Sequence, residues 1–151
     1  MSGAVMIGAR RNLIVTLFAL AATACGPAAR EPVVVEDAWA NATPVGASVA
    51  AVYLQVTAGE ADTLLSATTT VADQIEMHTS SEENGMMRMR PIPSVPLEPG
   101  KPFTFGPMGA HFMLMDLRQP LQAGLRFPMT LQFEHAGELT VQVEVVEPGS
   151  R

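Results

Sequence analysis

Short runs of alternating apolar and polar residues dominate the chain from residue 33 onward. No useful stretch there shows the period of about 3.6 residues that an amphipathic helix requires. The run from Leu139 to Val146 reads LTVQVEVV, and its near-perfect alternation is typical of a strand with one buried face. Earlier runs are rich in valine, threonine and aromatic residues, which favour strands. The pattern predicts an all-β domain.

Turn-forming residues separate these runs at short intervals. Asn84-Gly85 is the strongest hairpin signal, because both residue types accept the positive φ of a two-residue turn. The prolines at 91, 93, 96 and 99 exclude a central strand and predict an edge strand or a loop. About eight short strands with frequent turns predict a β-sandwich or a Greek-key barrel. The candidate segments are 33–39, 49–57, 64–71, 75–81, 86–92, 101–105, 111–117, 127–134 and 139–146.

The N-terminal segment has the pattern of an export signal. Arg10 and Arg11 precede an apolar run at 13–22, which suits a signal peptide and is too short for a membrane span of about 20 residues. The run ends in ATACG, which resembles a lipobox whose Cys25 becomes the lipidated first residue. Simple cleavage after Ala24 is the alternative. We expect an exported protein with a membrane anchor at Cys25.

Length and composition narrow the remaining possibilities. We expect a signal peptide over 1–24, a tether over 25–32, one domain over 33–147 and a short tail over 148–151. Lys and Arg number 9 against 15 for Asp and Glu, and the net charge of −6 argues against a nucleic-acid partner. Cys25 is the single cysteine, so an intramolecular disulfide is excluded.

Histidine and methionine gather between residues 78 and 113. His78, Met89, His111 and Met113 are separated by ten, twenty-one and one residues. Thioether sulfur is a soft ligand and imidazole suits copper, so this mixed set favours Cu(I) over zinc, calcium or magnesium. A blue-copper site would need a cysteine thiolate, and the sole cysteine lies in the leader. No nucleophile elbow, P-loop or paired-carboxylate pattern indicates an enzyme.

The predicted hairpin gives these residues a geometry. A two-residue turn at Asn84-Gly85 pairs residues whose numbers sum to 169, so Met89 faces Ser80 and becomes a diagonal neighbour of His78. His111 and Met113 are two residues apart on a strand and therefore point to one side. The sequence thus predicts two ligand pairs, each on one face. Whether the two faces meet depends on tertiary structure.

The alternative interpretation is ordinary packing, since methionine is a flexible core filler. His135, in the expected turn at 135–137, is interpreted as solvated. The acids Glu76 and Asp116 do not fall at the ligand spacing, which argues against a carboxylate-bound zinc or iron. The methionines assigned to the core are Met77, Met86, Met108, Met115 and Met129.

With this spacing, the chain resembles the periplasmic copper chaperone family PCuAC, whose His-X10-Met-X21-His-X-Met pattern it matches at every interval. The resemblance covers about 33–146, including VEDAWA at 35–40, AAVYLQV at 50–56, GMMRMRP at 85–91, LEPG at 97–100 and HFMLMDLRQPLQAG at 111–124. It implies a cupredoxin-like Greek-key β-sandwich that binds one Cu(I) through the four residues, without catalytic turnover. It also implies copper delivery to the CuA site of cytochrome c oxidase subunit II, alone or with a Sco-type protein.

The chain departs from the family pattern beside both histidines. Thr79 stands where a methionine often follows the first histidine, and Met108-Gly109-Ala110 replaces the usual Gly-Gly-Tyr. The His/Met-rich tail of some relatives is not seen in the closing EPGSR, so a second, Cu(II) site is not expected. Two other functions stay open: an envelope copper scavenger, and a metal-free β-sandwich lipoprotein that acts as an interaction module.

Overall fold

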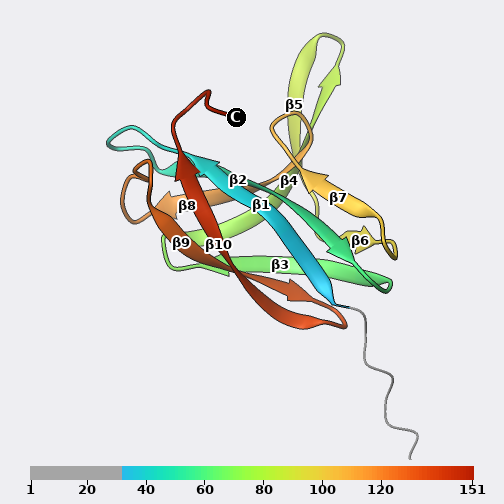
Figure 1. The fold of residues 1–151 in the computed structure, drawn as a ribbon. Coiled ribbons are helices and arrows are strands. Elements are labelled where there is room, and N and C mark those ends of the chain that lie inside the picture. The colour runs from blue at the N-terminus through green and yellow to red at the C-terminus, as the bar shows by residue number, and fades with distance from the viewer. Residues whose placement is uncertain (1–31) are drawn as a thin grey trace, which may run out of the picture.

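The computed structural model describes residues 32–151 (Figure 1). In this part of the chain the regular secondary structure consists of strands, and no helix long and apolar enough to cross a membrane is found there. The ten strands are β1 (Val33–Asn41), β2 (Val49–Ala58), β3 (Asp62–Thr69), β4 (Ala72–Glu83), β5 (Met86–Pro91), β6 (Val95–Leu97), β7 (Pro102–Phe105), β8 (Ala110–Leu117), β9 (Arg126–Phe133) and β10 (Gly137–Val146).

The strands form one continuous sheet in the order β5-β4-β8-β2-β1-β10-β9-β3-β6, and β7 pairs with β2 outside this path. Every pairing is antiparallel except that of β1 with β10. The sheet folds back on itself, because β3 and β4 are in contact although five strands lie between them in this order. Figure 1 shows the β4–β5 hairpin projecting from the body of the molecule.

Alternate residues of the strands fill one apolar core. In β2 the residues Val52, Leu54 and Val56 are buried, while those between them are partly exposed. Phe105 stacks on Phe112 of β8, with ring centroids 4.3 Å apart. β8, which carries the predicted ligands His111 and Met113, is thus anchored in the core.

The predicted all-β sandwich is confirmed, but residues 32–151 contain ten strands instead of about eight. The segment left as an edge strand or loop contains β6, which pairs with β3 at the end of the sheet. An edge position is where a strand tolerates a residue such as Pro96. The predicted signal peptide and Cys25 lie outside the described residues.

The hairpin register agrees with the sequence prediction. Asn84 and Gly85 have φ values of 55° and 76°, as a two-residue turn between β4 and β5 requires. Ser80 pairs with Met89, and His78 pairs with Pro91, so the paired numbers sum to 169. The turn therefore sets where Met89 lies relative to His78.

Replacing Gly85 by alanine should lower the free energy of unfolding by about 1–2 kcal/mol, because a Cβ is strained at positive φ. The measurement is urea unfolding of both proteins. Gly109→Ala is the matched control: its φ is not positive, and an added Cβ would meet no atom within 4 Å. Its unfolding free energy should change by less than about 0.5 kcal/mol. Equal losses in the two variants would contradict this account of the turn.

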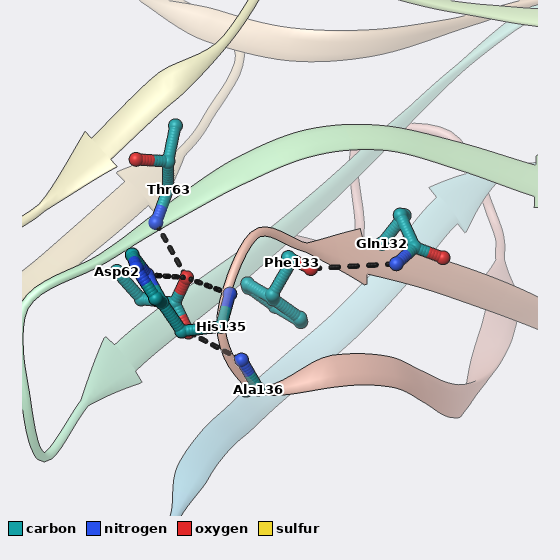
Figure 2. Close-up of polar contacts among 6 residues, drawn as sticks. All are labelled: Asp62, Thr63, Gln132, Phe133, His135 and Ala136. Carbon is teal, nitrogen blue, oxygen red and sulfur yellow. Dashed lines mark hydrogen bonds and ion pairs between the residues drawn. The ribbon is translucent and has the colours of Figure 1, made fainter.

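Asp62, the first residue of β3, ties the β9–β10 turn to the sheet (Figure 2). Its carboxylate is buried and accepts hydrogen bonds from the backbone N–H groups of Thr63 at 2.7 Å, His135 at 2.9 Å and Ala136 at 2.8 Å. The His135 Nδ1 atom lies 3.4 Å from Oδ1, so this half-exposed histidine has a protein partner as well as solvent. Burial of the carboxyl raises its pKa, but the four contacts together hold the pKa of Asp62 below its ordinary value.

Asp62→Asn should destabilise the protein by about 1–3 kcal/mol at neutral pH, because an amide cannot accept all these bonds as a charged group does. The folded-state pKa is lowered, so the carboxylate stabilises the fold above the unfolded-state pKa of about 3.9. That contribution is lost as the pH falls through the folded-state pKa. Urea unfolding of wild type and variant, repeated at about five pH values between 7 and 2, should show that the difference between their free energies of unfolding shrinks in acid. The control is Asp116→Asn, at an exposed position. A difference that stays constant to the lowest pH would be inconsistent with this role.

Candidate metal centre

The four predicted ligands lie on three adjacent strands. Met89 is on β5, His78 on β4, and both His111 and Met113 are on β8. The core takes the alternate residues, including Met77 and those on either side of Met113 in β8. His78, His111 and Met113 therefore point to the opposite, outer face of the sheet.

Strand pairing brings the two predicted ligand pairs together. His78 lies directly opposite His111 across β4 and β8, with ring centroids 6.1 Å apart and an interplanar angle of 74°. Met113 is opposite Glu76, and Met89 is opposite Ser80. The two methionines are therefore diagonal neighbours of His78, on its two sides and on one face.

Each imidazole has one nitrogen engaged by an acceptor. His111 is 4% exposed, and its Nδ1 lies 3.2 Å from the Gly109 carbonyl oxygen. The same carbonyl accepts a hydrogen bond from the Ser80 backbone N–H at 3.0 Å, which fixes the loop before β8 to β4. Since a carbonyl only accepts, His111 donates from Nδ1 and keeps its lone pair on Nε2.

His78 presents the complementary arrangement. Its Nε2 lies 2.9 Å from Oε2 of Glu76, while its Nδ1 is buried and has no hydrogen-bond partner among residues 32–151. A buried polar atom without a partner costs about 1–3 kcal/mol, so such atoms are uncommon in folded proteins. A metal ion bound at Nδ1 would remove that cost. The atom is therefore the clearest structural sign of a ligand on this face.

The methionines differ widely in exposure. Met89 is 53% exposed on the edge strand, whereas Met113 is half-buried on β8. The core assignment is confirmed for Met77 and Met129 but is wrong for Met86 and Met108, which are 56% and 80% exposed; Met115 is only half-buried. All of β5 is exposed, so it offers no core for its methionines to fill.

The donor set determines which metals suit this face. Among the residues that the structure describes, no three His, Cys, Asp or Glu side chains group in a way that could hold a metal. A site here would combine the two imidazoles with thioether sulfur. These donors are neutral and partly soft, a combination that favours Cu(I) over hard divalent cations.

Glu76 is the site residue that the sequence interpretation missed. The sequence pattern tests Glu76 only as a direct metal ligand, for which its spacing is wrong. Its position two residues before His78 puts both side chains on one face of a strand, and that was the available signal. The structure shows the contact that follows from this placement.

Two comparisons based on sequence find lipoproteins. A family described as "Putative lipoprotein LpqE-like" matches residues 33–145. A protein of Leifsonia xyli subsp. xyli (strain CTCB07), named "Putative lipoprotein Lxx21020", is 30% identical over 112 residues, which are 74% of this chain and 68% of that protein. The family match over residues 33–145 spans all ten strands described, except for the last residue of β10.

Solved structures of similar fold are copper-binding domains. The copper-bound PCuAC domain from PmoF2 superposes with a TM-score of 0.66 at 26% identity, over 80% of this chain and 97% of that domain. The solution structure of the Cu(I) form of DR1885 from Deinococcus radiodurans gives a TM-score of 0.60 at 26% identity, over 81% of this chain and 83% of that one. These likenesses confirm the predicted sandwich architecture.

Proposed function

We propose that this chain, which belongs to the LpqE-like lipoprotein family and has the fold of PCuAC copper-binding domains, is an exported metallochaperone that carries one Cu(I) ion. The observation that carries the proposal is the buried Nδ1 of His78, which has no hydrogen-bond partner within the described part of the chain and belongs to a residue directly opposite His111. The proposed ligands are His78, Met89, His111 and Met113.

The chemistry of these ligands suits a carrier. Neutral imidazole and thioether donors leave the charge of Cu(I) uncompensated, and soft sulfur discriminates against the common hard cations. His111 is buried, whereas Met89 lies on an exposed edge strand. A recipient protein can therefore approach the metal from the Met89 side and replace that thioether first. A carrier must give up its copper ion in this way, whereas a copper enzyme keeps its metal.

The proposed location and recipient rest on the leader and on the family resemblance. The signal-peptide pattern over 1–24 and the lipobox at Cys25 support an exported, periplasmic lipoprotein, and the name of the matched family agrees with an anchor. The proposed recipient is the CuA site of cytochrome c oxidase subunit II, with or without a Sco-type protein. Deletion of the gene should then impair oxidase assembly in copper-poor medium. Copper sensitivity in rich medium, with normal oxidase, would instead indicate an envelope scavenger.

The binding function is tested by titrating the purified protein with Cu(I), under anaerobic reducing conditions, against a coloured Cu(I) chelator. We expect the protein to withdraw one equivalent of copper from the chelator. Absence of competition would overturn the proposal and leave the metal-free lipoprotein that acts as an interaction module.

A further inference from the structure

Glu76 is held against His78 on the outer face of β4. Its Oε2 lies 2.9 Å from the His78 Nε2 atom, and the side chains of the two residues are 50% and 15% exposed. Glu76 is also directly opposite Met113 across the β4–β8 pairing. The carboxylate therefore borders the proposed copper site without belonging to the proposed ligand set.

The contact determines which nitrogen of His78 can bind a metal. A carboxylate oxygen only accepts hydrogen bonds, so the hydrogen of a neutral His78 ring resides on Nε2. The lone pair is then on Nδ1, the buried atom that has no hydrogen-bond partner among the described residues. The surroundings of both ring nitrogens thus indicate the tautomer of His78 that carries its hydrogen on Nε2.

His111 has the opposite arrangement. Its Nδ1 lies 3.2 Å from the Gly109 carbonyl oxygen, which leaves the lone pair on Nε2. The rings meet edge to face with centroids 6.1 Å apart, from directly paired backbone positions. The two histidines therefore have their free lone pairs on different nitrogens, because the Glu76 carboxylate engages Nε2 of His78 and the Gly109 carbonyl engages Nδ1 of His111.

We propose that Glu76 is a positioning residue that fixes the tautomer and ring orientation of His78, so that His78 binds Cu(I) through Nδ1 while His111 binds through Nε2. The inference deepens the proposed function and rests on it. An acceptor of this kind orients a ligating imidazole and makes it more basic, and its removal typically lowers metal affinity by about 10–100-fold.

The test is ¹⁵N nuclear magnetic resonance of the imidazole nitrogens in the purified protein, before and after addition of Cu(I). Cu(I) has a filled d shell, so the signals stay sharp. Before addition, His78 should be protonated at Nε2 and His111 at Nδ1. Copper should then shift the resonances of His78 Nδ1 and His111 Nε2, with the His78 Nε2–H retained. A His78 ring that is protonated at Nδ1, or that binds copper through Nε2, would overturn the proposal.

Two variants separate positioning from folding. Glu76→Ala should give a mixture of His78 tautomers without copper and an affinity for Cu(I) lowered by about 10–100-fold. Glu76→Gln keeps an oxygen acceptor and should restore the Nε2-protonated tautomer and most of the affinity. Glu82→Ala, on the same face of β4 and opposite Met87, is the matched control and should behave as wild type. An unchanged tautomer and affinity in Glu76→Ala would refute the role of Glu76.

The proposal and the proposed function can fail separately. The tautomer is measured without metal, so it reports on Glu76 even if the wild-type protein binds no copper. A wild type that leaves all Cu(I) on the chelator would refute the carrier function and the binding mode together. Copper binding with the wrong His78 nitrogen would refute only the inference about Glu76.

Discussion

Replacing His111 by alanine is expected to lower the Cu(I) affinity of the protein by more than about 100-fold. Loss of an outer acceptor of a metal-bound histidine already costs about 10–100-fold, so loss of the ligand itself should cost more. His111 is also the most buried donor of the set, at 4% exposed, and faces His78 from the paired position. No neighbouring side chain on β8 can replace its imidazole, because the adjacent outer-face donor is the thioether of Met113.

The affinity is measured by anaerobic competition with a Cu(I) chelator, together with urea unfolding of each variant. His111→Ala also loses the Nδ1 contact to Gly109 and should unfold about 1–3 kcal/mol more easily, which leaves the sandwich folded in buffer. His135→Ala is the control, since this histidine lies in the β9–β10 turn beside Asp62 and not on the outer face of β4 and β8. Wild-type copper affinity in a folded His111→Ala protein would remove His111 from the ligand set.

The second large effect is expected for Met89→Leu, which should weaken Cu(I) binding by about tenfold or more while unfolding as wild type does. Leucine keeps the apolar volume of methionine and removes only the sulfur. Met89 is 53% exposed, so its substitution should change the free energy of unfolding by less than about 0.5 kcal/mol. Loss of copper affinity at constant stability would therefore report on the thioether.

The chain supplies a closely matched control in Met87→Leu. Met87 is on the same strand and the same face as Met89, is 57% exposed, and lies two residues farther from the level of His78. Competition with the chelator should give an affinity within about twofold of wild type for this variant. Similar losses from both variants would show that copper binds to the hairpin as a whole, and no loss from Met89→Leu would exclude it as a ligand.

Local geometry could be predicted from the sequence wherever a turn determined it. Asn84-Gly85 requires a two-residue turn, and that turn fixes the register that makes Met89 a diagonal neighbour of His78. The shared face of His111 and Met113 follows equally from the alternation of a strand. These features depend on backbone conformation within a few residues.

The meeting of the two ligand pairs could not be predicted from local pattern. It depends on β4 pairing with β8, two strands that lie more than twenty residues apart, and several strands in the chain had a suitable apolar face. The family resemblance implied the four-residue set, but spacing alone did not place His78 opposite His111. The strand order is determined by how the whole core packs.

The prediction of core positions for Met86 and Met108 is wrong, because local pattern does not reveal how exposed a methionine is. Methionine has no polar group, so its pattern along a strand cannot distinguish a core position from an exposed one. The pattern predicts a core position for Met86, yet among the described strands β5 pairs only with β4, at the end of the sheet, and is exposed along its whole length. Met86, Met87 and Met89 are all more than half exposed, so exposure does not single out a donor; the position of Met89 diagonal to His78 does.

The most direct test of the account is X-ray absorption spectroscopy at the copper edge of the purified protein loaded with one equivalent of Cu(I). The account predicts a Cu(I) ion bound by two imidazole nitrogens and two thioether sulfurs, with one sulfur lost in Met89→Leu and none in Met87→Leu. A copper ion with only nitrogen and oxygen neighbours, or one whose sulfur contribution persists unchanged in Met89→Leu, would contradict it.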